Sequence, residues 1–183
     1  MKLTAKVKLQ PTNAQAERLK RTLETSNAAC NWISQQAWDT KTFGQFTIHK
    51  LVYNAVRAQF PLTAQMVVRC IAKVTDAYKP NRAAQQIFKP LGPITYDARI
   101  LAWKMDKAEV SIWTLDGRQK MQFVTSAHNK TLLAQQRGES DLCLIDGQFY
   151  LFTACDLDEP TSADVAEFLG IDRGVDMAVQ ALS

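Results

Sequence analysis

The sequence has no apolar run near the ~20 residues that a helix needs to cross a membrane. Its first residues, Met1 to Lys6, alternate polar and apolar side chains and lack the apolar stretch of a secretory signal. We therefore expect no membrane partner and a cytoplasmic location.

Paired metal-binding cysteines are also missing. Four cysteines and two histidines are spread along the chain with no C-x-x-C spacing: Cys30, Cys70, Cys143, Cys155, His49 and His128. This spacing argues against a zinc site of paired ligands. Apolar helical surroundings predict that Cys30 and Cys70 are buried thiols, in keeping with a reducing compartment.

Acidic residues are scarce in the first half of the chain. Residues 1–90 hold 14 Lys+Arg against 4 Asp+Glu, a net charge of +10, whereas residues 91–183 hold 8 against 14, a net charge of −6. A first half this basic indicates a polyanionic partner, with nucleic acid as the leading candidate. The alternative is a solvated helical surface that happens to be rich in lysine and arginine.

The chain begins with a pattern of period two. Residues 3–9 place four apolar side chains on one face and polar ones on the other, which predicts a half-buried strand that Pro11 ends. Thr12 is expected to cap a helix over residues 13–39, with Gln15 completing a capping box.

Two further helices follow. Thr47 is expected to cap the second, which Pro61 ends, and Thr63 to cap the third. The apolar stripe of the second helix is predicted to contain Ile48, Leu51, Val52, Ala55 and Phe60. The stripe of the third is predicted to contain Met66, Val67, Cys70, Ile71, Val74 and Tyr78. Facing stripes predict a three-helix bundle. The basic segment 79–90 is expected to be an ordered connector or a surface whose Lys79, Arg82 and Lys89 meet phosphates, with a solvated linker as the alternative.

From residue 91 the apolar period changes from helical to alternating. Strands are predicted at 94–96, 100–103, 109–114, 119–124, 141–145 and 149–154, with a hairpin turn at Asp146-Gly147 and a short helix over 129–137 that ends at Gly138. Such strands form an antiparallel barrel or sandwich. The first strand needs a partner and is expected to join this sheet. The fold class is therefore α+β, a barrel with an inserted helical bundle.

An acidic segment, 156–167, is predicted to be a linker. Residues 168–176 then combine an apolar run, Asp172, an Arg-Gly turn and a second apolar run, which predicts two strands joined by a tight turn. A carboxylate fixed at the end of a buried strand suits Mg²⁺. The alternative is that Asp172 is an ordinary hairpin residue.

The order of several motifs is distinctive. They are the basic first strand running into Pro11-Thr12-Asn13-Ala14-Gln15, the helix with Asn27 and Asn31-Trp32, the strands Ile94-Thr95-Tyr96-Asp97, Val110-Ser111-Ile112 and Gly117-Arg118, the hairpin Gly147-Gln148-Phe149-Tyr150-Leu151, and the closing Leu169-Gly170-Ile171-Asp172-Arg173-Gly174-Val175. In this order they resemble the N-terminal part of the TnpB family, the transposon-encoded RNA-guided DNA nucleases (OrfB-type transposases), which are similar to compact type V CRISPR effectors.

This resemblance implies a division of the chain. The barrel, residues 1–10 and 91–155, is similar to the family's wedge domain (OB-like), and the insert, residues 11–90, to its recognition domain. Residues 168–183 are similar to the first hairpin of a RuvC nuclease domain, which has an RNase H-like fold. In the family, wedge and recognition domains hold a guide RNA and its heteroduplex with target DNA. A prokaryotic cytoplasm is implied as well.

The resemblance also assigns a metal ligand. Asp172 matches the first Mg²⁺-ligating aspartate of the RuvC site, whereas Asp176 receives no catalytic assignment. Such a site needs further carboxylates to hold two Mg²⁺ ions, and the sequence stops at Ser183. We therefore expect this polypeptide alone neither to bind Mg²⁺ tightly nor to cleave DNA. The hairpin 168–183 is expected to pack on the barrel or to exchange between two copies in a homodimer.

Seven cations are our candidates for contacts with nucleic-acid backbones, chosen by charge and position: Lys6, Lys8, Arg57, Arg69, Lys73, Lys79 and Arg82. Trp32, Tyr53 and Tyr78 are expected in the core rather than stacked on bases. The leading function is the guide-RNA- and target-DNA-binding portion of an RNA-guided endonuclease. The alternatives are a nuclease-inactive regulator from the same family and a protein-interaction module.

Overall fold

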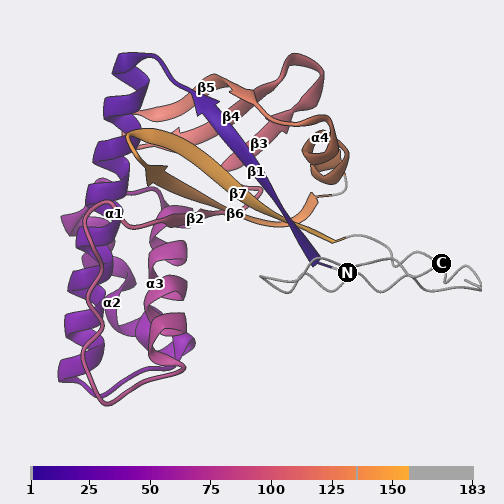
Figure 1. Cartoon of the computed structure of the whole chain (residues 1–183). Coiled ribbons are helices and arrows are strands. Elements are labelled where there is room, and N and C mark those ends of the chain that lie inside the picture. Colours follow the sequence, from indigo (N-terminus) through magenta and orange to yellow (C-terminus); the bar gives the residue numbers. More distant parts are fainter. Residues whose placement is uncertain (1, 135, 157–183) are drawn as a thin grey trace, which may run out of the picture.

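The structure, a computed structural model, describes residues 2–134 and 136–156. The predicted hairpin 168–183, with Asp172, and all but the first residue of the predicted linker lie outside these residues. Figure 1 shows how the elements are arranged. In chain order they are β1 (Lys2–Gln10), α1 (Asn13–Asp39), α2 (Gln45–Gln59), α3 (Ala64–Tyr78), β2 (Ile94–Tyr96), β3 (Leu101–Lys104), the 3₁₀ turn η1 (Met105–Lys107), β4 (Glu109–Thr114), β5 (Gly117–Val124), α4 (Ala127–Ala134), β6 (Gln136–Ile145) and β7 (Gln148–Asp156).

Strand β1 lies at the centre of an antiparallel sheet with the order β2-β6-β7-β1-β5-β4-β3. It pairs with β7 from Lys2 to Lys8 and with β5 from Lys8 to Gln10, which confirms that the first strand joins the later sheet. The sheet curls into a nearly closed barrel with β2 and β3 as its ends. The Tyr96 hydroxyl of β2 donates to the Trp113 carbonyl of β4 at 2.9 Å, a bond that links the β2 end to the strand beside β3.

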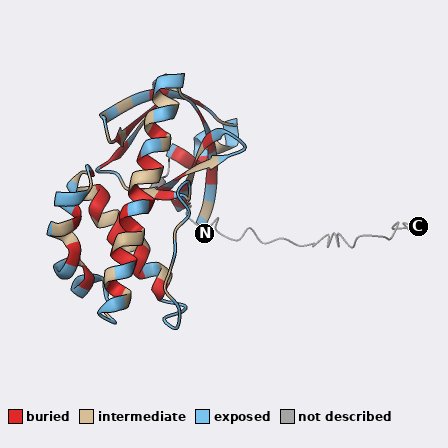
Figure 2. Ribbon diagram, turned by 90° about the vertical axis from the view of Figure 1, so that its left-hand side faces the viewer, coloured by how far each residue is buried: buried red, intermediate tan, exposed pale blue. Residues whose placement is uncertain are grey.

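Helices α1, α2 and α3 pack on one another and stand between β1 and β2 in the chain. The N-terminus of α1 has the predicted capping box, in which Thr12 and Gln15 each bond the other's backbone N–H. Thr63 caps α3 by accepting from the Met66 N–H, as predicted. Figure 2 shows that the helices are buried along the sides that face their neighbours and exposed elsewhere. The described part is therefore α+β, as the sequence predicts.

Two predicted boundaries are wrong. Helix α2 begins at Gln45, with Gly44 as its N-cap and no side-chain capping bond, so Thr47 lies inside the first turn. Its predicted apolar stripe is also too wide, because Leu51 is exposed and Phe60 is the C-cap residue rather than part of the helix. Helix α4 ends at Ala134, and Gly138 belongs to strand β6 instead of ending a helix.

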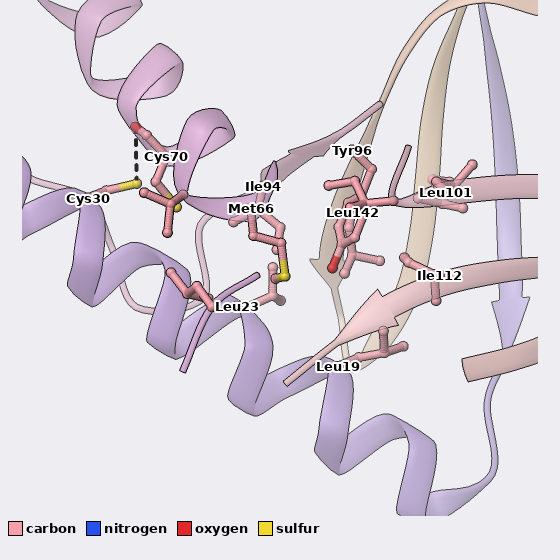
Figure 3. Packing of buried hydrophobic residues seen from close by; sticks show 14 of the residues in the cluster. Leu19, Leu23, Cys30, Met66, Cys70, Ile94, Tyr96, Leu101, Ile112 and Leu142 are labelled. Atoms are coloured by element: carbon pink, nitrogen blue, oxygen red, sulfur yellow. Dashed lines mark hydrogen bonds between the residues drawn. The ribbon is translucent and has the colours of Figure 1, made fainter. Parts of the chain in front are cut away.

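One apolar core runs from the bundle into the barrel. Leu19 and Leu23 of α1 are fully buried, and Figure 3 shows Leu23 near the bundle residue Met66 and Leu19 near the barrel residue Ile112. The N-terminal half of α1 therefore closes one opening of the barrel with apolar side chains. Cys30 and Cys70 are buried thiols in this core, as predicted, with the Cys30 thiol 3.8 Å from the Cys70 carbonyl oxygen.

A polar stripe on α1 fixes the segment that leads from α3 to β2. The Asn27 amide donates to the carbonyls of Pro90 and Gly92, at 3.0 and 2.8 Å. Asn31 exchanges two hydrogen bonds with the Phe88 backbone, and Ser34 donates to the Gln86 carbonyl at 2.6 Å. Segment 86–92 is therefore an ordered connector bound along α1, which is one of the interpretations that the sequence left open. Within the described residues no helix is both long and apolar enough to span a membrane.

Candidate nucleic-acid interface

Two predicted cations lie on the outer surface of the barrel. Along β1 the residues Ala5, Val7 and Leu9 point into the core, so Lys6 and Lys8, which alternate with them, point outward. The register of β1 with β7 places Lys6 opposite Phe152 and Lys8 opposite Tyr150. Directly opposite residues in a sheet lie on the same face. We call these four residues the β1–β7 face.

Three of the four side chains of the β1–β7 face, those of Lys6, Tyr150 and Phe152, contact one another. The Lys6 ammonium lies 4.5 Å from the centre of the Tyr150 ring and 5.9 Å from that of Phe152. The two ring centres are 6.4 Å apart, and both rings are half-buried. Proteins that bind single-stranded nucleic acids combine such rings with lysines: the bases stack on the rings and the phosphates contact the cations.

The charge around this face is uneven. Asp141 of β6 lies opposite Phe152 and accepts a hydrogen bond from Thr95 at 2.7 Å. On the other side, Lys8 lies opposite the apolar Val124 of β5. A phosphate chain would therefore follow β1, where the lysines are, and avoid β6. Burial, followed by the Asp141 charge, raises the pKa of the neighbouring Cys143 thiol, which keeps it protonated and unreactive.

Lys73 has two protein partners. Its ammonium donates to the Asn27 side-chain oxygen and to the Pro93 carbonyl, both at 2.6 Å, and lies 5.0 Å from the centre of the Phe88 ring. These contacts fasten α3 to the connector. A phosphate would have to compete with both oxygens for this lysine.

Three of the four remaining candidates are held by protein oxygens, as Lys73 is. Arg69 forms an ion pair with Glu139 of β6, and Arg57 donates to the Leu62 carbonyl. Lys79 forms an exposed ion pair with Asp76 at 2.6 Å, which water and salt weaken. Arg82 instead lies over the Phe43 ring, with its guanidinium carbon 5.9 Å from the ring centre. Arg82 thus joins Lys6 in resting against an aromatic ring.

Further cations of the basic half hold the bundle to the barrel. Arg21 of α1 bonds Asp116, in the turn between β4 and β5, at 2.5 Å, and Arg18 lies 3.6 Å from the same carboxylate. The net charge of the first half therefore overstates the number of cations that a ligand can use. This use of charge is not visible in the sequence.

The structure adds two residues that the sequence interpretation missed, Tyr150 and Phe152. Their alternation with the buried Phe149 and Leu151 is visible in the sequence and predicts that they point outward. Their place beside Lys6 depends on the register of two strands that are far apart in the chain. Among the aromatics considered for stacking, Tyr78 is fully buried and hydrogen-bonded to Ser34 at 2.9 Å, so its predicted core position is confirmed.

The predicted metal ligand, Asp172, lies outside the described residues. Within residues 2–134 and 136–156, no three His, Cys, Asp or Glu side chains lie close enough together to hold a metal ion.

Neither the known family models nor the curated proteins include a match to this sequence. A function must therefore be inferred from the residues and their arrangement.

Proposed function

We propose that this chain is the nucleic-acid-binding portion of a TnpB-like, transposon-encoded RNA-guided DNA endonuclease. The barrel, residues 1–10 and 91–155, serves as a wedge-like domain, and the insert, residues 11–90, as a recognition-like domain. The ligands are a guide RNA and its target DNA. The observation that carries the proposal is the β1–β7 face, where exposed Lys6 and Lys8 stand beside the rings of Tyr150 and Phe152.

The chemistry of this face suits a polyanion with flat bases. Each lysine that neutralises a phosphate releases counterions, which makes binding favourable at low salt. Each ring offers a surface on which any base can stack, so the face binds without reading sequence. That division matches RNA-guided recognition, in which base pairing supplies the specificity and the protein holds the backbone.

The proposal extends to Asp172 through the resemblance. It assigns this residue as the first Mg²⁺ ligand of a RuvC-type site, at the end of the first strand of the hairpin 168–183. A lone carboxylate leaves most of the water on a Mg²⁺ ion, so tight binding requires further carboxylates.

The test measures binding of a structured RNA at two salt concentrations. Replacing Lys6 and Lys8 with alanine should weaken binding and lower the slope of log affinity against log salt by about one unit per lysine. Asp141→Asn should tighten binding because it removes a negative charge beside the face. The control is Lys107→Ala, an exposed lysine of the η1 turn.

Phe152→Ala separates stacking from charge. It should weaken binding to RNA with unpaired bases while leaving the salt slope unchanged, because no phosphate contact is lost. A double lysine variant that binds like the wild type would contradict the proposed face. A wild-type chain that binds no nucleic acid at low salt would instead favour the protein-interaction module.

A further inference from the structure

The middle of the chain has an unusual charge. Residues 40–96 contain eight Lys+Arg and a single acid, Asp76, a net charge of +7. Helix α2 has no Asp or Glu at all. Four of the eight cations are held by protein oxygens, as described above for Arg57, Arg69, Lys73 and Lys79. The other four are Lys41, Lys50, Arg82 and Lys89.

Three of these four cations rest on aromatic rings. The Lys41 ammonium lies 3.3 Å from the centre of a Trp38 ring, and the Lys50 ammonium lies 4.5 Å from that of Phe46. Arg82 lies over Phe43 in the same way, with its guanidinium carbon 5.9 Å from the ring centre. We call these six residues the distal tip.

The residues of the distal tip come from different elements that meet at one end of the helical bundle. Trp38 lies in the last turn of α1, Phe43 in the loop that follows and Phe46 in the first turn of α2. The Phe43 ring lies 4.6 Å from Tyr78, the last residue of α3, so the ends of three helices meet there. In Figure 1 this end of the bundle points away from the barrel.

Packing against the core accounts for Trp38 and Phe43, which are half-buried, but not for Phe46. Phe46 is 73% exposed, although a phenylalanine in a folded core would be covered. The nearest acid in the chain, Asp39, accepts a hydrogen bond from Gln35 at 2.8 Å, one turn earlier on α1. An exposed ring with one lysine on it and further cations on the neighbouring rings suits a partner that carries both flat apolar groups and negative charge.

We propose that the distal tip binds unpaired nucleotides of a single-stranded nucleic acid. Bases stack on Phe46 and Trp38, and Lys41, Lys50 and Arg82 neutralise the flanking phosphates. A cation resting on an exposed ring is held weakly, so a base can replace it while the ammonium moves to a phosphate. This site rests on the proposed function and deepens it, because it gives the recognition-like insert a contact of its own that shares no residue with the β1–β7 face.

Single-stranded RNA and single-stranded DNA share this chemistry. The experiment therefore uses labelled oligo(U) and oligo(dT) of about twelve nucleotides, within the usual site size of such surfaces, and a duplex of equal length. Fluorescence anisotropy gives the affinity of the full chain for each. A preference for RNA over DNA would identify the source of the ligand.

Phe46→Ala is the main variant, because an exposed side chain can be removed without disturbing the core. It should weaken binding of the single strands about tenfold, the loss of one stacked base. The matched control is Leu51→Ala, on the same helix and 47% exposed, which should bind like the wild type. Lys50→Ala should weaken binding and lower the salt slope.

A second readout follows Trp38 directly. Oligonucleotide binding should quench tryptophan fluorescence, and Trp38→Phe should remove that part of the quenching while keeping a ring for stacking. Quenching that is unchanged in Trp38→Phe would overturn the proposal. So would duplex binding as tight as single-strand binding and insensitive to Phe46→Ala.

Failure here is distinguishable from failure of the proposed function. If Phe46→Ala binds like the wild type while Phe152→Ala binds more weakly, the distal tip is not a site and the β1–β7 face stands. If Phe46→Ala alone weakens binding, the reverse holds. If the wild type binds no oligonucleotide at low salt, both are overturned.

Discussion

Asn27 is the residue on which the connection between bundle and barrel depends most. It is fully buried, and its amide donates to the Leu23, Pro90 and Gly92 carbonyls while its oxygen accepts from Lys73. A buried polar group of this kind stabilises the fold only while every partner is present. The sequence singles out Asn27 through the family resemblance, and the structure supplies its physical purpose.

Replacing Asn27 with leucine should therefore be costly. The change leaves the connector carbonyls and the Lys73 ammonium without their buried partner, which costs about 2–3 kcal/mol. Urea unfolding followed by circular dichroism measures the loss, and faster chymotryptic cleavage after Phe88 reports release of the connector. Asn54→Leu, at an exposed position of α2, is the control. Equal stability of Asn27→Leu and wild type would refute this account.

Tyr96 should make the fold sensitive to alkali. Burial raises the pKa of its hydroxyl, and contact with Cys30, followed by burial, raises that of Cys70. A raised pKa means that the folded state favours the protonated hydroxyl. The contribution of Tyr96 to the free energy of unfolding is therefore fully present below the unfolded tyrosine pKa of about 10 and is lost as pH rises further. Tyr96→Phe should lower stability at pH 7, because the bond to Trp113 is gone, yet lose less between about pH 9 and 11. An equal alkaline loss in both chains would contradict this origin.

At the residue scale, the candidate interface could be predicted only in part. The alternation of β1 places Lys6 and Lys8 outside the barrel from sequence alone. The sequence does not show that Lys73 is held by Asn27 and Pro93, because these oxygens come from α1 and the connector. Tyr150 and Phe152 join the face through a strand register that no local pattern encodes.

At the scale of elements, helix caps offer a comparison within one chain. Thr12 and Thr63 accept hydrogen bonds from the first turns of α1 and α3, whereas Thr47 lies past the Gly44 cap of α2. Thr12→Ala and Thr63→Ala should each lower the free energy of unfolding by about 1 kcal/mol. Thr47→Ala should change it by less than about 0.5 kcal/mol, as surface substitutions usually do. Thermal or urea unfolding decides, and a cost at Thr47 as large as at Thr12 would mean that threonine content, rather than capping, matters.

The same comparison explains which elements the sequence predicts. A side-chain cap leaves a local signature, so the starts of α1 and α3 are predicted correctly, while the Gly44 cap leaves none. Gly138 was misjudged for a related reason. A Cβ atom there would lie 2.8 Å from that of Ala154 on β7, so glycine is required by a close approach between strands. The sequence pattern alone makes the same glycine look like a helix end.

At the scale of the whole molecule, α1 separates the two proposed binding surfaces. Its N-terminal half closes the barrel, and its last turn carries Trp38 of the distal tip. A helix of 27 residues is about 40 Å long. The two surfaces are therefore too far apart for a short oligonucleotide to contact both at once, whereas a longer strand can bind them together.

Affinity should consequently depend on the length of the strand. An oligonucleotide of about six residues spans roughly 20 Å at the stacked spacing of about 3.4 Å and occupies one surface at a time. One of about thirty residues can reach both, and its second contact forms at a high effective concentration, which raises the apparent affinity by about 10²-fold or more. Phe46→Ala and Phe152→Ala should each remove most of this gain, while either variant should still bind the six-residue strand. Affinity that rises only in proportion to the number of nucleotides, equally in wild type and variants, would show that the two surfaces do not act on one strand.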